Sequence, residues 1–148
     1  MTDVRSTPVA KKRSDYLPPD FFIEQVDMVF WLEPNHTRVT TTTTIKRNGN
    51  HERPLILDGE QMELKSIQLN AKPFEHYSIE TGKLTLNVVD DAFTLDIETL
   101  IDPENNTSLE GLYQSNGTFC TQCEAEGFRK ITYFLDRPDA VSYTHLRA

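Results

Sequence analysis

Residues 109–139 read LEGLYQSNGTFCTQCEAEGFRKITYFLDRPD, and two polar residues of this stretch, Gln122 and Glu124, lie two positions apart. In an extended chain, residues at that spacing point to the same side. A carboxylate beside an amide makes a small acceptor site that suits an ammonium group or a hydroxyl. The same spacing is also typical of solvated acids in a loop, so these residues alone leave both interpretations open.

Upstream of this stretch, short segments of alternating apolar and polar residues follow one another, separated by turn residues such as Asn48-Gly49 and Thr81-Gly82. This alternation is typical of half-buried strands, and helical periodicity is weak throughout. We expect strands at residues 22–32, 38–46, 54–57, 64–69, 74–80, 84–88 and 93–97, with the first two forming a β-hairpin. The pattern predicts an all-β sandwich or sheet.

Length, composition and charge indicate one soluble globular domain. The chain has 148 residues, of which 37% are hydrophobic and 26% are charged. Its net charge of −8 argues against nucleic acid as a partner. No apolar run reaches the roughly 20 residues of a membrane helix, and the N-terminus lacks the apolar segment of a secretory signal. We therefore expect a cytoplasmic protein with no membrane partner.

The cysteines and histidines do not form a metal-binding pattern. Cys120 and Cys123 make a single C-x-x-C pair, whereas a zinc ribbon needs a second pair. In a cytosolic protein two such thiols are reduced by default. No two of the histidines have ligand spacing; they are His36, His51, His76 and His145. We expect neither a metal site nor redox chemistry in this chain.

The opening stretch also matches a longer motif. A Gln-x-Glu-Ala element is followed by an Arg and, seven residues later, by Asp-x-Pro. L-E-G-L-Y-x-S and C-E-A-E-G-F-R also stand intact, at residues 109–115 and 123–129. In these features the chain resembles the aminopeptidase N family of zinc metallopeptidases, most closely its bacterial branch. The motif residues are Gln122, Glu124, Ala125, Arg129, Asp136 and Pro138.

The resemblance implies a fold, a domain division and a binding site. Residues 15–139 would form most of the family's N-terminal β-domain, an antiparallel β-sandwich or saddle-like sheet, and residues 1–14 a disordered polar arm. Gln122 and Glu124 would hold the free α-ammonium of a peptide substrate. The peptide bond between Glu124 and Ala125 is expected to be cis. Arg129 and Asp136 are expected to be structural partners.

The resemblance also implies an activity that this chain does not carry out alone. The family needs an H-E-x-x-H helix, a downstream Glu and a G-A-M-E-N-type element to bind zinc and hydrolyse peptides. None of these is in the sequence. We therefore expect no catalytic residue and no metal ligand here. Zinc would belong to the full-length parent aminopeptidase, a hydrolase of peptide catabolism, and the catalytic domain of that parent would be a partner.

Two alternatives stay open. A leukotriene-hydrolase-like relative shares the β-domain and the Gln-x-Glu-Ala element, although the intact C-E-A-E-G-F-R favours the aminopeptidase N branch. A free-standing β-sandwich binding module without catalysis is the alternative from a different class. An exposed apolar docking patch would favour the enzyme interpretation, whereas high stability as a lone domain would favour the binding module.

The last residues depart from the family pattern. Residues 140–148 read AVSYTHLRA, and nothing beyond about Val141 matches. The string SYTHLRA is similar to translated sequencing-adapter sequence. We expect residues 140–148 to be a non-family tail of artefactual origin, so that the β-domain is truncated at its C-terminal end.

Sequencing the source locus past the codon for Asp139 tests this expectation. We expect the reading frame to continue into a G-A-M-E-N element and an H-E-x-x-H motif, because the resemblance stops in the middle of a domain. A genuine stop codon directly after Ala148 would contradict the enzyme interpretation and favour the binding module.

Overall fold

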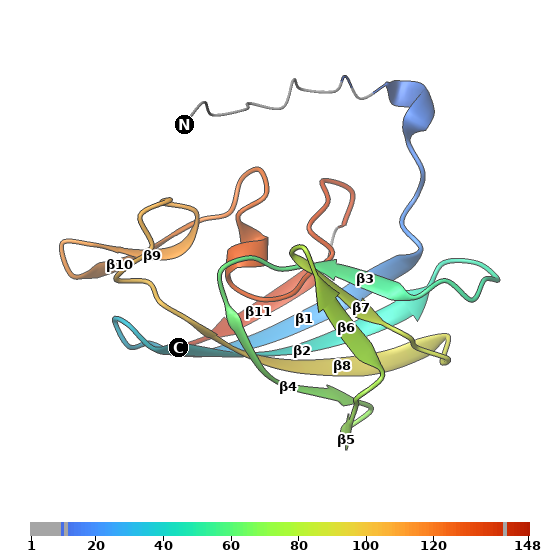
Figure 1. The fold of residues 1–148 in the computed structure, drawn as a ribbon, viewed down its shortest axis with the longest axis horizontal. Coiled ribbons are helices and arrows are strands. Elements are labelled where there is room, and N and C mark those ends of the chain that lie inside the picture. The colour runs from blue at the N-terminus through green and yellow to red at the C-terminus, as the bar shows by residue number, and fades with distance from the viewer. Residues whose placement is uncertain (1–9, 11, 141) are drawn as a thin grey trace.

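The computed structural model describes residue 10, residues 12–140 and residues 142–148, and these residues form an almost entirely β-stranded fold (Figure 1). Within them, a six-stranded main sheet has the order β11-β1-β2-β8-β4-β5, a three-stranded sheet has the order β3-β7-β6, and β9 and β10 form a separate hairpin. The all-β prediction is confirmed. The strands are β1 (Phe21–Trp31), β2 (Thr37–Arg47), β3 (Leu55–Asp58), β4 (Glu63–Leu69), β5 (Lys72–Pro73), β6 (Tyr77–Glu80), β7 (Lys83–Leu86), β8 (Ala92–Ile101), β9 (Gly111–Ser115), β10 (Thr118–Gln122) and β11 (Tyr143–Arg147).

Six of the seven predicted strands match strands of the structure to within a few residues, the seventh is shortened, and β9, β10 and β11 were not predicted. β1 and β2 form the expected antiparallel hairpin, and every other pairing in the sheets is antiparallel apart from that of β11 with β1. The segment 74–80, predicted as one strand, is a strand only from residue 77 onward, and residues 74–76 connect the two sheets. β5 ends at Pro73 in the main sheet, and β6 begins at Tyr77 in the small one. Pro73 has no N–H to donate to a sheet ladder, so a change of sheet here breaks little pairing.

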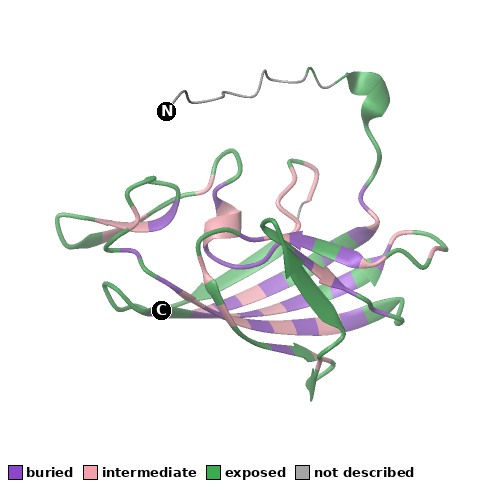
Figure 2. Ribbon diagram, viewed as in Figure 1, coloured by how far each residue is buried: buried purple, intermediate pink, exposed green. Residues whose placement is uncertain are grey.

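A β-bulge at Glu24 explains how β1 buries side chains on both sides of it. The register with β2 shifts between Ile23 and Gln25. Before the shift Phe21 and Ile23 are buried, and after it Val26 and Met28 are buried. Because a bulge inserts one extra residue, it resets the two-residue alternation and keeps one face of the strand on the core. The alternation along β1, β2 and β8 is visible in Figure 2.

The core contains a segment that is not a strand. Residues 131–134 follow the single-turn 3₁₀ helix η2 (Phe128–Lys130) and are all buried. The Thr41 hydroxyl of β2 donates to the Thr132 hydroxyl at 3.1 Å, and the Thr99 hydroxyl of β8 donates to the Ile131 carbonyl at 3.2 Å. On the other side, Phe134 exchanges backbone hydrogen bonds with Asp58 at the end of β3. The segment therefore connects the main sheet to the small sheet.

Near the N-terminus, the structure describes only part of the predicted polar arm. Most of residues 1–14 lie outside the described residues, and Arg13 and Ser14 belong to an exposed 3₁₀ turn, η1 (Arg13–Asp15). No helix in the described part of the chain is long and apolar enough to cross a membrane.

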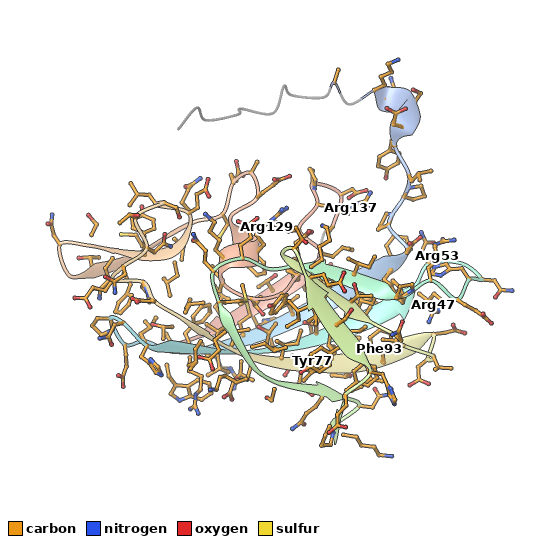
Figure 3. All side chains as sticks on the ribbon, in the orientation of Figure 1. Arg47, Arg53, Tyr77, Phe93, Arg129 and Arg137 are labelled. Atoms are coloured by element: carbon orange, nitrogen blue, oxygen red, sulfur yellow. The ribbon has the colours of Figure 1, made fainter. Side chains whose placement is uncertain are left out.

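Arg47, the last residue of β2, is buried although it is charged, with 3% of its side chain exposed. Its guanidinium donates to the carbonyls of Val88 (2.8 Å) and Arg53 (3.0 Å). It also pairs with the Asp91 carboxylate at 3.1 Å and lies 4.8 Å from the centroid of the Phe21 ring. Arg47 therefore ties the β2–β3 and β7–β8 loops to the core at this end of the molecule, where Figure 3 labels it.

Replacing this arginine should destabilise the fold. Arg47→Met leaves two buried carbonyls without donors, and we expect the free energy of unfolding to fall by about 3 kcal/mol. Urea denaturation followed by circular dichroism measures the change. Lys46→Met, at the exposed neighbouring position, should change that free energy by no more than about 0.5 kcal/mol. Equal effects of the two substitutions would contradict this role for Arg47.

Candidate functional site

Gln122 and Glu124 lie at the start of the loop that joins β10 to η2. Gln122 is the last residue of β10, paired with Gly111 of β9, and both side chains are exposed. The Gln122 side-chain amide donates to the Glu124 carbonyl at 3.2 Å. The Glu124–Ala125 peptide bond is cis, as the resemblance implied. The structure thus places both predicted residues on one exposed loop, while their role in binding stays a prediction.

Gln122 uses its side-chain amide nitrogen as a donor within the loop, so its amide oxygen remains available to bind a ligand. Because Nε2 bonds to the backbone of the loop, Oε1 is left as an acceptor. Among the described residues, the Glu124 carboxylate has neither a hydrogen-bond nor an ion-pair partner. Gln122 and Glu124 therefore offer one amide oxygen and one carboxylate as acceptors, a set that suits an ammonium donor.

Two glycines allow the loop to fold back on the β9–β10 hairpin. A methyl group on Gly127 would lie 2.5 Å from the Gln122 carbonyl oxygen and 3.1 Å from the Gly111 nitrogen. A methyl group on Gly111, whose φ is +75°, would lie 2.8 Å from Cβ of Lys130. The Gly127 N–H also donates to the Cys123 carbonyl at 2.9 Å. Close backbone packing at both positions thus sets the path of the loop.

Sequence reasoning did not anticipate the hairpin that supports the loop. β9 and β10 are joined by Asn116 and Gly117, both with positive φ (51° and 78°). Asn-Gly between two short extended segments is a strong signal for a two-residue hairpin turn, and it was available in the sequence. The importance of Gly111 and Gly127 had no such signal, because it arises from contact between two separate segments.

Behind the loop, Arg129 and Asp136 are paired, as the sequence predicted. Arg129 Nε lies 2.9 Å from Asp136 Oδ2, the Arg129 backbone N–H donates to the same oxygen at 3.2 Å, and Nη2 donates to the Asp136 carbonyl at 3.2 Å. Burial disfavours the charge on the guanidinium, but the hydrogen bond to Asp136 and the charges of Asp58, Asp136 and Glu126 outweigh it and raise the pKa of Arg129 above its usual value.

Cys123 lies between the two predicted binding residues and is half-buried. Burial and, to a smaller extent, the charge of Asp136 raise the pKa of its thiol. A thiol with a raised pKa carries little thiolate at neutral pH and is a poor nucleophile. Both Cys120 and Cys123 are free. Nothing about Cys123 therefore indicates a catalytic role in this loop.

The possible metal ligands of this chain are its His, Cys, Asp and Glu side chains. Among the described residues, no group of three or more His, Cys, Asp or Glu side chains is placed to hold a metal ion. The expectation that this chain holds no metal stays a prediction.

The chain has clear relatives. The peptidase M1 N-terminal domain family matches residues 25–146. The chain is 46% identical over 143 residues to aminopeptidase N of Caulobacter vibrioides, covering 95% of this chain and 17% of that protein. It is 47% identical over 136 residues to aminopeptidase N of Haemophilus influenzae, covering 90% of this chain and 16% of that protein. The chain thus spans about a sixth of the length of the curated relatives it matches.

Solved structures show the same fold. Legionella pneumophila aminopeptidase A in complex with aspartic acid superposes with a TM-score of 0.83 at 31% identity, over 92% of this chain and 17% of that one. An M1 zinc metallopeptidase from Deinococcus radiodurans gives a TM-score of 0.71 at 15% identity, over 87% of this chain and 32% of that one. Yeast LTA4 hydrolase gives a TM-score of 0.71 at 19% identity, over 84% of this chain and 22% of that one. The last two show a shared fold alone.

The family match continues past the boundary that the sequence analysis placed at residue 139. It ends at residue 146, inside the predicted tail. In the structure, Tyr143–Arg147 form β11, which pairs in parallel with β1, and all five residues are exposed. Residues 143–147 therefore lie at the edge of the main sheet, and the artefactual origin of residues 140–148 stays a prediction.

Adding a methyl group at Gly127 should displace the loop. φ at Gly127 is −90°, so alanine is allowed there and the effect of Gly127→Ala comes from the close contact with Gln122. We expect the free energy of unfolding to fall by about 1–3 kcal/mol and the NMR signals of Gln122 and Glu124 to shift. Gly49→Ala, where a methyl group meets nothing within 4 Å but φ is +87°, should cost about 1 kcal/mol. It should leave the loop signals unchanged. Unshifted loop signals in Gly127→Ala would contradict the contact.

Proposed function

The chain belongs to the peptidase M1 N-terminal domain family, and from that premise we propose that it is the N-terminal domain of a zinc-dependent aminopeptidase, in which it recognises the free α-amine of a peptide substrate. Its 46–47% identity to aminopeptidase N sequences supports the parent activity. The observation that carries the recognition role is the exposed loop that holds both residues: the Gln122 amide donates to the Glu124 carbonyl, and the Glu124 carboxylate has no partner among the described residues. We also propose a cytoplasmic location and a role in peptide breakdown.

The chemistry of the loop fits recognition of an N-terminus. A protonated α-amine has three N–H donors, and Glu124 and Gln122 offer a charged and a neutral acceptor for them. A charge-assisted hydrogen bond of this kind is available only to a peptide whose terminal amine is free. Holding that amine also sets the register of the substrate, because it fixes how far the first peptide bond lies from the loop. The proposed result is removal of single residues from the N-terminus.

Hydrolysis itself is assigned to the rest of the parent enzyme. Zinc would supply a Lewis acid and an activated water there, whereas the described residues of this chain would bind and orient the substrate. We therefore expect the chain alone to have no aminopeptidase activity.

Substituting Glu124 in the full-length aminopeptidase tests the recognition role. Glu124→Ala removes the charged acceptor, and we expect kcat/KM for a peptide substrate to fall about 10- to 100-fold while the zinc content stays unchanged. The measurement combines steady-state kinetics with metal analysis. Glu52→Ala, an exposed glutamate in the β2–β3 loop, is the control and should leave kcat/KM unchanged. Wild-type kinetics in Glu124→Ala would remove Glu124 from the site.

A further inference from the structure

Arg129 lies among four carboxylates that come from three segments of the chain. The bonds to Asp136 are short, while Glu126, Glu60 and Asp58 lie 3.7, 3.9 and 4.0 Å from the guanidinium. Only 15% of the arginine side chain is exposed. Figure 3 shows Arg129 well apart from Arg53. A partly buried guanidinium with this many acceptors has little freedom to reorient.

The orientation of Arg129 is fixed by hydrogen bonds to Asp136 and Glu60. Asp136 accepts from both the side chain and the backbone N–H of Arg129, and the Arg129 carbonyl accepts from the Glu60 N–H at 2.8 Å. The adjoining residues 131–134 are buried in the core. Arg129 is therefore attached to the buried core of the molecule. On the side of the loop, its Nη2 atom pairs with the carboxylate of Glu126.

The loop has two exposed acids, and only one of them faces this arginine. Glu124 and Glu126 lie two residues apart and have the same charge. Glu126 is 3.7 Å from Arg129, and among the described residues Glu124 has no such partner. Without the arginine, Glu126 would be a second unpaired carboxylate next to the first, and the loop would lose its contact with the base. An ammonium ligand would then meet two competing acceptors on a mobile segment.

We propose that Arg129 is a positioning residue that holds the loop through Glu126 and leaves Glu124 as the single carboxylate presented to a substrate amine. Arg129 does not touch the substrate in this proposal, and Asp136 acts by orienting Arg129. The inference deepens the proposed function and rests on it where it concerns substrate binding. The effect of Arg129 on the order of the loop does not depend on that function.

The first test uses the 148-residue chain and needs no ligand. In Arg129→Met, we expect the NMR order parameters of residues 123–126 to fall from about 0.85 to below about 0.6, with those of β2 and β8 unchanged. Glu126→Gln alters only an exposed side chain, so it should fold, and it should lower the same order parameters by a smaller amount. Arg53→Met, which removes an exposed arginine paired with Asp20 at 2.6 Å, is the matched control and should change none of them. Wild-type loop order in both Arg129→Met and Glu126→Gln would overturn the proposal.

The second test uses the full-length aminopeptidase and two competitive ligands that differ only in the α-amine. In Arg129→Met, we expect the preference for the amine-bearing ligand to fall about tenfold, and KM to rise more than kcat falls. A purely structural defect would reduce the amount of active enzyme and leave that preference intact, which would overturn the positioning role. If Glu124→Ala also leaves the preference unchanged, the proposed function fails, and the loop-order measurement still decides the role of Arg129.

Discussion

The buried segment 131–134 is the constraint on which the arrangement of this domain depends. It is not a strand, so its backbone polar groups need partners other than a complete sheet ladder. The Thr99 hydroxyl of the main sheet donates to the Ile131 carbonyl, and Asp58 of the small sheet pairs with the backbone of Phe134. The Thr41 hydroxyl adds a bond to the side chain of Thr132. The abundance of threonine in β2 has a structural reason here. A threonine has the branched shape that a strand favours and also a hydroxyl that can bond to a buried neighbour.

The loop with Gln122 and Glu124 is held in place by the structure at its two ends. One end leaves the β9–β10 hairpin, and the other enters η2 and the buried segment. Between them, the contact of Gly127 with the backbones of Gln122 and Gly111 brings the ends together without intervening side chains. An exposed loop with a supported base is the usual way in which a fold combines accessibility with a defined geometry. The all-β framework contributes to the site through this support.

Two shielded arginines also support irregular parts of the chain. The chain is strongly acidic, and ion pairs such as Arg53–Asp20 and Lys65–Glu63 are exposed contacts that contribute little to stability. Arg129 differs because it is largely shielded from water and is bonded to both the side chain and the backbone of Asp136. Arg47 has a similar role at the opposite end, where it satisfies carbonyls of two loops. Two partly or fully buried arginines thus secure the irregular connections that the sheets do not hold.

Local patterns in the sequence determined most of the strands and the all-β class, and the family resemblance indicated the two candidate binding residues. A two-residue alternation and the spacing of Gln122 and Glu124 are properties of neighbouring positions, so they can be read without knowing what packs against them. The change of sheet between β5 and β6, the bulge at Glu24 and the burial of residues 131–134 were decided only by the tertiary structure. The same is true of Arg129, whose partners Asp58 and Glu60 are some seventy residues away in the chain. Such contacts depend on how the sheets pack, and no local pattern specifies that packing.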